Sequence, residues 1–160
     1  MAGWDDMPKN SLKQVLDAPE NARAITQFTA EFFVNVLIRA RAILGNDFDA
    51  VIVLLTIQTY VGEKAFRTNE RNVRKLSFND PYPEDLLVPI SRLAIANITG
   101  LPRETVRRKV ALLEELGMVR KVGTRGILIS YEFAFGPQRA ELALMTHAQL
   151  RRLLDRTFAL

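Results

Sequence analysis

The most specific pattern in the chain is Ser91-Arg-Leu-Ala-Ile-Ala-Asn-Ile-Thr-Gly-Leu-Pro-Arg-Glu-Thr-Val-Arg-Arg-Lys-Val-Ala-Leu-Leu-Glu-Glu-Leu-Gly117. Ser91 is a good N-cap for a helix that runs to about Ile98, because its hydroxyl can accept a hydrogen bond from the first turn. A glycine and a proline then interrupt the helix. A second helix is predicted over residues 102–116, with Pro102 in its first turn and Gly117 directly after its end. Two short helices joined by a tight turn that contains glycine form a helix-turn-helix unit.

Small and apolar side chains stand at the offsets that such a unit requires. Ala96 is small enough to let the two helices approach, Gly100 suits a turn conformation that a Cβ atom would oppose, and Leu101 is placed to fill the gap between the helices. The predicted inward-facing residues are Leu93, Ile95 and Ala96 in the first helix and Val106, Val110, Leu113 and Leu116 in the second. Each feature alone is a weak signal, but their order and spacing together strongly indicate a helix-turn-helix.

A two-stranded hairpin is predicted directly after the second helix. Residues 118–122 and 127–133 are rich in β-branched and other apolar residues, and two glycines flank the turn between them. A hairpin in this position is a wing. Lys121, Thr124 and Arg125 lie at or near its tip, where they can reach phosphate groups or a minor groove. Charged residues at a hairpin tip can also serve only to keep the protein soluble, and that alternative stays open.

The positive charge of the chain is concentrated in the same region. The whole chain has a net charge of +4. Residues 89–125 contain eight basic and three acidic residues, a net charge of +5, whereas the other residues contain 14 basic and 15 acidic ones, a net charge of −1. The eight basic residues are Arg92, Arg103, Arg107, Arg108, Lys109, Arg120, Lys121 and Arg125. A basic segment in an otherwise neutral chain is typical of a module that binds a polyanion.

The second helix is predicted to expose its charged side. At 100° per residue, Glu104, Arg107 and Arg108 lie opposite the apolar stripe, and Arg103 lies at the edge near the N-terminus. An α-helix fits the major groove of DNA, where arginine pairs with guanine and a carboxylate accepts from cytosine, each good contact giving about 1–3 kcal/mol of discrimination. The alternative is a solvated helix with an ion pair between Glu104 and Arg108. Ser91 either caps its helix only or also helps the helix N-terminus to bind phosphate.

Two motifs in this region are Arg103-Glu-Thr-Val-Arg-Arg108 and Leu113-Glu-Glu-Leu-Gly-Met-Val119. They resemble the winged helix-turn-helix of the catabolite activator protein family, in which Arg-Glu-Thr-Val-x-Arg is followed by Leu-Glu-x-x-Gly and two hydrophobic residues. The resemblance implies that Arg103, Glu104 and Arg108 contact bases and that Thr105 contacts the DNA backbone. It covers residues 89–130, about a quarter of the chain. The glycine-rich β-roll and cyclic-nucleotide segment of that family have no counterpart upstream, so cyclic-nucleotide control is not expected.

Helices are predicted on both sides of the helix-turn-helix. Residues 21–45 and 137–158 form helices with wide apolar stripes, and residues 46–76 form a half-buried scaffold helix. Residues 1–20 are predicted to be a loose arm with no more than one helical turn, and the loop before the helix-turn-helix contains a short strand at residues 86–88. The layout resembles that of the multiple-antibiotic-resistance repressor (MarR) family, which implies that the first and last helices pair and build a homodimer.

Composition excludes several classes of function. The chain has 160 residues, no cysteine and one histidine, which argues against a disulfide scaffold, a thiolate or histidine-rich metal site and a catalytic triad. We therefore expect no catalytic residues, no metal site and no cofactor. The first residues carry two acids and no apolar run, unlike a secretory signal, and the uncharged run 50–62 is too short for a bilayer core of about 30 Å. A cytoplasmic protein without membrane contact is expected.

The aromatic residues leave two alternatives open. They pack either in the protein core or around a pocket for an unidentified small-molecule effector. The residues concerned are Phe28, Phe32, Phe33, Tyr60 and Phe66.

The sequence thus predicts a mainly α fold with a small β-wing. Residues 21–160 form a single winged-helix domain, in which residues 86–133 are the helix-turn-helix and wing and the terminal helices are dimerisation helices. The predicted function is a sequence-specific transcriptional regulator that binds a pseudo-palindromic site on double-stranded DNA as a homodimer. The alternative is a winged-helix module that binds another protein without reading DNA. An enzyme is not expected, because no constellation of nucleophile and base is found.

Overall fold

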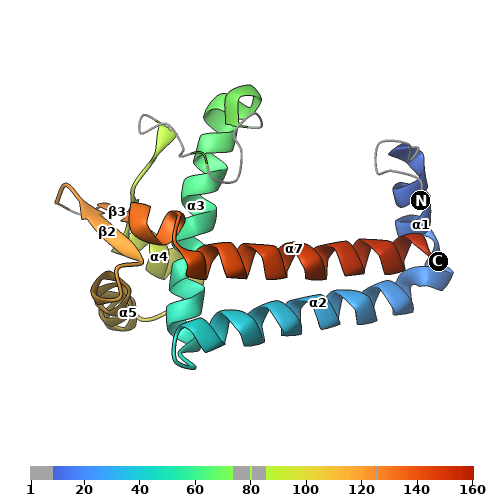
Figure 1. Ribbon diagram of the computed structural model, residues 1–160, viewed down its shortest axis with the longest axis horizontal. Coiled ribbons are helices and arrows are strands. Elements are labelled where there is room, and N and C mark those ends of the chain that lie inside the picture. The colour runs from blue at the N-terminus through green and yellow to red at the C-terminus, as the bar shows by residue number, and fades with distance from the viewer. Residues whose placement is uncertain (1–8, 74–79, 81–85, 125) are drawn as a thin grey trace. The chain divides into compact units, whose positions relative to one another are not determined.

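The computed structural model describes residues 9–73, 80, 86–124 and 126–160. These residues are mostly helical and include a small antiparallel sheet of three strands (Figure 1). The predicted class, mainly α with a small β element, is therefore confirmed. The chain divides into two compact units: unit 1 comprises Met1–Ala40 and Glu141–Leu160, and unit 2 comprises Arg41–Ala140.

The helices of the described residues follow most of the predicted ranges. They are α1 (Lys9–Asp17), α2 (Ala22–Ile43), α3 (Phe48–Val73), α4 (Arg92–Thr99), α5 (Arg103–Glu115), α6 (Tyr131–Ala134) and α7 (Pro137–Phe158), and a short 3-10 turn covers Pro19–Asn21. Residues 74–76, the predicted end of the scaffold helix, lie outside the described residues. None of the helices in the described part of the chain combines the length and the apolarity that crossing a bilayer requires.

The core of unit 2 forms around α3. This helix contacts α4, α5 and two strands of the sheet. Its apolar first half supplies Val51, Val53 and Ile57, none more than 1% exposed. Val106 and Val110 of α5 are buried to the same degree, so α5 is firmly attached to this core along one side. A rigid attachment of this kind holds the opposite side of α5 in a fixed orientation.

The sheet has the strand order β1-β3-β2, with β1 at Ile90–Ser91, β2 at Val119–Val122 and β3 at Gly126–Ile129. Ile90 of β1 pairs with Ile127 of β3, and both side chains are 1% exposed. The prediction of a strand at residues 86–88 is wrong. Val88 is exposed, and the chain pairs with the sheet only where Ile90 enters the core.

The second strand of the hairpin ends earlier than predicted. Ser130 accepts a hydrogen bond at Oγ from the amide of Phe133 over 3.1 Å, so it is the N-cap of the short helix α6. Its own amide donates to the carbonyl of Met118 over 3.0 Å, and its hydroxyl donates to the carbonyl of Gly117, so Ser130 also joins the two arms of the hairpin. The prediction of a strand as far as Phe133 is therefore wrong, because a serine cap overrides the β propensity of the aromatic residues that follow.

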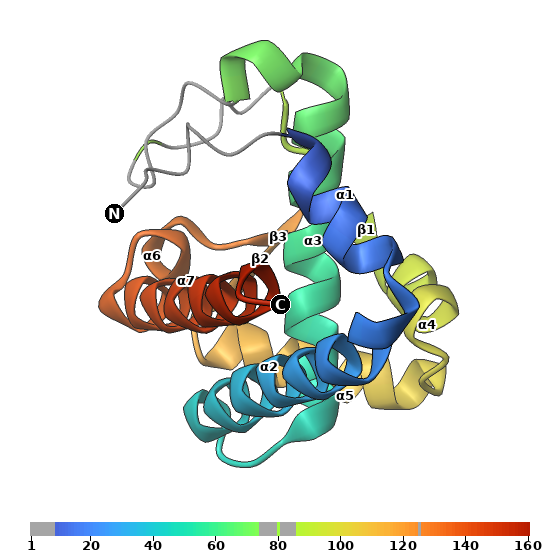
Figure 2. The ribbon, with the colours of Figure 1, turned by 90° about the vertical axis from the view of Figure 1, so that its right-hand side faces the viewer.

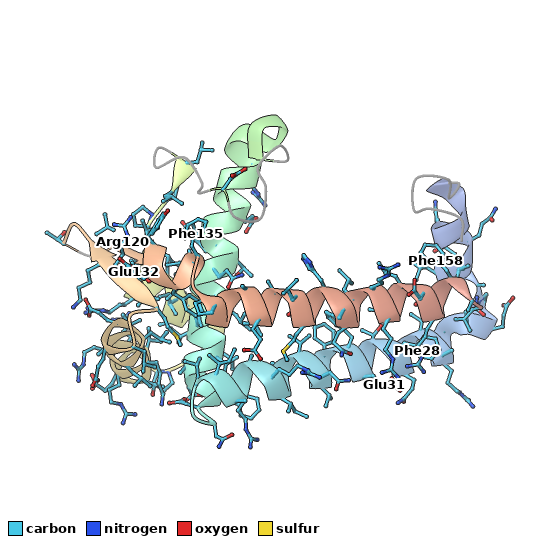
Figure 3. The ribbon with its side chains drawn as sticks, in the orientation of Figure 1. Phe28, Glu31, Arg120, Glu132, Phe135 and Phe158 are labelled. Carbon is cyan, nitrogen blue, oxygen red and sulfur yellow. The ribbon has the colours of Figure 1, made fainter. Side chains whose placement is uncertain are left out.

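Unit 1 contains two long antiparallel helices, α2 and α7, which lie side by side (Figures 1 and 2). Arg156 of α7 forms an ion pair with Glu31 of α2, and its guanidinium carbon lies 3.8 Å from the centre of the Phe28 ring (Figure 3). Further along the two helices, Arg39 Nη1 of α2 donates to Met145 Sδ of α7 over 3.5 Å. The first and last long helices therefore contact each other within one chain, as predicted, and the homodimer stays a prediction.

The N-terminal arm is more regular than predicted. Lys9–Asp17 forms the nine-residue helix α1 in place of a single turn. The side-chain amide of Asn21 donates to the carbonyl of Val15 over 3.1 Å, which ties α1 to the start of α2. Residues 1–8 lie outside the described residues.

Candidate nucleic-acid interface

Hydrogen bonds at both ends define α4. Ser91 Oγ accepts from the amide of Ala94 over 3.1 Å, so Ser91 is the N-cap, as predicted. At the other end Gly100 has a φ of +72°, and its amide donates to the carbonyl of Ala96. This left-handed conformation is one that glycine adopts without steric cost. The predicted break between the two helices is therefore confirmed.

Helix α5 is anchored by one side and ends at a glycine. Val106, Val110 and Leu113 are at most 1% exposed. Past the end of the helix, Gly117 has a φ of +69°, and the amide of Met118 donates to the carbonyl of Leu113 over 2.9 Å. This bond is characteristic of a Schellman motif. The helix therefore stops where predicted, and the hairpin follows at once.

Two leucines that were predicted to face inward are exposed. Leu93 is 49% exposed, because it lies about 200° around α4 from the buried Ile95. Leu116 is 50% exposed, because it follows the last turn of α5, where the chain bends away. Both predictions are wrong. Both side chains therefore add apolar surface to the exterior of unit 2.

The predicted charged side of α5 is exposed. The residues at its start, Pro102, Arg103 and Glu104, are all exposed, and so are Arg107 and Arg108. Thr105, implied as a contact to the DNA backbone, is half-buried. Within the described residues, Arg103 and Arg108 make no ion pair. Neither guanidinium group is therefore engaged by a carboxylate of the described residues.

Glu104 and Arg107 form a side-on pair on this exposed surface. Arg107 Nε donates to Glu104 Oε2 over 2.8 Å, and Arg107 Nη2 donates to Glu104 Oε1 over 2.7 Å. The hydrogen bonding between them lowers the pKa of Glu104 and raises the pKa of Arg107. The alternative pair between Glu104 and Arg108 does not form, because Arg107 reaches both carboxylate oxygens at once. The pairing orients both side chains.

Lys109 belongs to the attachment of α5 and not to its exposed side. Its Nζ lies 2.6 Å from Asp47 Oδ2, and both side chains are mostly covered. Asp47 also caps α3, since its Oδ1 accepts from the amide of Ala50 over 3.0 Å. Burial raises the pKa of Asp47, but the hydrogen bonds from Lys109 and Ala50 outweigh this effect and lower it overall. One carboxylate thus joins α3 to α5.

Of the two basic residues predicted for the wing, Lys121 and Arg125, the structure describes only Lys121. Lys121 Nζ lies 2.6 Å from Glu114 Oε2 of α5, so its charge is largely balanced. Thr124 is exposed at the tip, and Arg125 lies outside the described residues. Arg120 on β2 is exposed and makes no ion pair with a described residue (Figure 3). The sequence signal for Arg120 was the alternation of side chains along a strand, which sends it and Lys121 in opposite directions.

Four arginines of the basic segment therefore remain exposed without an ion pair to any described residue. They are Arg92, Arg103, Arg108 and Arg120, on α4, α5 and β2. The three other described bases of the segment, Arg107, Lys109 and Lys121, each face a carboxylate. The predicted binding of a polyanion thus depends on arginines, which donate in a forked geometry suited to guanine and to phosphate.

No effector or metal site emerges within the described residues. A shallow, open hollow at the start of α2 includes Phe28 among its lining residues, but the ring of Phe28 is already covered by Arg156. The side chain of Phe66 lies outside the described residues. Across the described ranges, no three acidic or histidine side chains gather closely enough to hold a metal ion. The effector pocket stays a prediction.

Comparisons of the chain with family models, with curated proteins and with solved structures find no match. The resemblance of residues 89–130 to the catabolite activator protein family therefore stays a prediction.

Proposed function

We propose that unit 2 binds double-stranded DNA in a sequence-specific manner and that the protein is a transcriptional regulator. The observation that supports this proposal is the two-sided character of α5. Its inner side is fixed in the core by Val106 and Val110, and its outer side exposes Arg103 and Arg108. A helix held in this way presents forked donors in a constant orientation, which is what readout in the major groove requires.

The order of elements supports a winged helix-turn-helix. Helix α4, a tight turn and helix α5 are followed at once by the β2–β3 hairpin, and β1 completes the small sheet. In this arrangement α5 is the recognition helix and the hairpin is the wing. Arg103 and Arg108 contact guanines, and Arg120 on the wing contacts phosphate groups. Ser91 caps α4, and Thr124 lies at the exposed tip of the wing.

Selection from a pool of random duplexes tests the proposal. The purified protein is expected to recover one preferred sequence that contains G·C pairs. Arg103→Ala and Arg108→Ala are each expected to relax the preference at one base pair, by about tenfold, because each removes one bidentate contact. The matched control is Arg67→Ala, which removes an exposed arginine from α3 of the same unit. Unchanged selection after both α5 substitutions would contradict the proposal.

We also propose that two copies of the chain associate through unit 1, because unit 1 buries very little by itself. Among its described side chains, only Ala40 and Thr157 are buried. Phe33, Val34 and Ile38 of α2 are 57%, 54% and 58% exposed. The three residues lie within about 140° of one another around α2, and an exposed apolar patch of this kind is typical of a surface that another protein covers. The pair of helices therefore lacks the covering that its apolar residues require.

A second copy fits this surface well. Residues 32–38 carry no charge, so the same segment of another copy meets them without like-charge repulsion, as a symmetric contact requires. Leu144 and Leu150 of α7 are also exposed, by 69% and 41%. Together with the three residues of α2 they represent on the order of 500 Å² of apolar surface, which approaches the ~800 Å² per partner of a standard interface.

Sedimentation of the full chain tests the association. The wild-type protein is expected to sediment as a dimer, and Ile38→Asp as a monomer, because the substitution places a charge in the centre of the contact. Ile98→Asp is the matched control, since Ile98 lies on α4 of unit 2 and is 59% exposed, against 58% for Ile38. A dimer that survives Ile38→Asp, or a monomeric wild-type protein, would contradict the proposal.

A second candidate function is supported by the outer side of α4. Leu93 and Ile98 are 49% and 59% exposed, and exposed apolar side chains of this size are typical of surfaces that dock another protein. A protein-binding module is expected to show no DNA affinity that falls steeply with salt, whereas a DNA-binding one loses affinity as counterions compete for the phosphates. A titration against duplex DNA at two salt concentrations separates the two functions.

A further inference from the structure

We propose that Arg107 contacts guanine directly and that Glu104 is its positioning residue, rather than a separate contact to cytosine. The inference rests on the proposed function, since it concerns the same side of α5. Arg107 occupies the variable position of the motif Arg103-Glu-Thr-Val-Arg-Arg108, to which the family resemblance assigns no role. In the structure, two hydrogen bonds join Arg107 to Glu104, and these bonds indicate the role of Arg107.

The donors that remain on Arg107 are suited to a base. A guanidinium has five N–H donors, and the pair with Glu104 uses one on Nε and one on Nη2. Both hydrogens of Nη1 and the second hydrogen of Nη2 therefore remain. One of the Nη1 hydrogens and that Nη2 hydrogen point in parallel from the end of the guanidinium. Two parallel donors at this spacing match O6 and N7 of guanine in the major groove.

Both carboxylate oxygens of Glu104, by contrast, already accept a hydrogen bond from Arg107. Each oxygen keeps a second lone pair, so a cytosine amino group would have to share an oxygen with Arg107. The guanidinium also balances a negative charge that would otherwise face the phosphates of DNA. In addition, the pair holds a long, flexible side chain in one orientation before binding, which reduces the ordering that binding must impose. Glu104 thus acts through Arg107.

The test compares base preferences, position by position, after selection from random duplexes. The proteins are the wild type, Glu104→Gln, Arg107→Lys and the double variant. Glutamine cannot form the paired bonds, and lysine is a point charge that lacks the fork. Both single variants are expected to relax the preference for guanine at the same base pair, by about tenfold, and the double variant is expected to relax it no further.

Matched controls separate this effect from a general loss of binding. Glu115→Gln neutralises another exposed carboxylate of α5 and is expected to keep the wild-type preference. Arg103→Ala is expected to relax a different base pair. Since the side chains of Glu104 and Arg107 are 64% and 58% exposed, their variants are expected to fold as the wild type does, which circular dichroism can verify.

The outcomes distinguish the inference from the function on which it rests. If Glu104→Gln relaxes a cytosine at a different base pair, if the effects of the two variants add, or if Glu104→Gln changes nothing, the inference is overturned while DNA binding stands. If the wild-type protein recovers no preferred sequence, the proposed function itself fails, and the inference with it.

Discussion

At the scale of single residues, Asp47 shows why charge counts from sequence are an incomplete guide to binding. Composition places Lys109 in the same basic segment as the exposed arginines. Its neighbour in space, however, is a carboxylate 62 positions earlier, and no local pattern announces a pair so far apart in the chain. The cap that Asp47 provides for α3 is a local feature, because it depends only on the residues that follow Asp47. Its ion pair with Lys109 is not local.

The pair between Asp47 and Lys109 predicts a pH-dependent stability. Asp47→Asn retains a side chain that can cap α3 but loses the ion pair, and we expect it to lower the free energy of unfolding at pH 7 by about 1 kcal/mol. The pKa of Asp47 is lowered in the folded protein. Its contribution is therefore present above the usual aspartate pKa of about 3.9 and is lost as the pH falls through the lower, folded value.

Urea unfolding at pH 7 and at successively lower pH checks this prediction. The difference between wild type and Asp47→Asn is expected to shrink towards zero as the carboxyl group of the wild type becomes protonated. Lys109→Met removes the same ion pair from the other side and is expected to lose little further stability in combination with Asp47→Asn. A difference between wild type and Asp47→Asn that keeps its full size at the lowest pH would contradict the assignment.

At the scale of elements, local signals predicted helix ends better than strand ends. Ser91, Gly100 and Gly117 mark their boundaries through their own backbone conformation or hydrogen bonds, and each lies where the sequence placed it. The end of β3 depended instead on whether Ser130 would continue a strand or cap a helix. Its cap was not anticipated, because the aromatic residues after it favour a strand by propensity alone.

The conformation of the turn between α4 and α5 predicts that alanine substitutions at two glycines change the free energy of unfolding in opposite directions. Gly100→Ala is expected to lower the free energy of unfolding by about 1–2 kcal/mol, because Gly100 has a φ of +72° and a Cβ atom is strained there. Gly62→Ala in α3 is expected to raise it by about 0.5–1 kcal/mol, because it lies inside a helix and a Cβ atom would meet nothing within 4 Å. Thermal unfolding of both variants measures the contrast.

Equal effects of the two substitutions would contradict this account of the turn. The result also bears on DNA binding, since the turn sets the position of α5. Gly100→Ala is expected to weaken specific binding beyond what its loss of stability explains, whereas Gly62→Ala is expected to leave it unchanged.

At the scale of the whole molecule, the two units differ in how completely they bury their apolar residues. Unit 2 contains nine large side chains of less than 2% exposure, such as Ile57, Ile95 and Leu113. The described residues of unit 1 include none, although about half of the residues in this unit are apolar. The width of the apolar stripe on α2 was visible in the sequence, and with it the need for a second partner. Which surfaces α7 leaves uncovered required the structure, because only contacts show which side faces its neighbour.

This difference predicts that the two units unfold separately and that only one transition depends on protein concentration. If unit 1 gains its core from a second copy, a 100-fold dilution weakens it by about 2.7 kcal/mol, because association is favoured by mass action. Unit 2 has its own core and is expected to unfold at the same temperature at every protein concentration.

Circular dichroism at 222 nm, recorded while the wild-type protein is heated at roughly 100 μM and 1 μM, measures the two transitions. The first is expected to shift to lower temperature on dilution, and the second is not. In Ile38→Asp the first transition is expected at low temperature at both concentrations. A single transition that is independent of concentration in the wild type would mean that unit 1 is stable without a second copy.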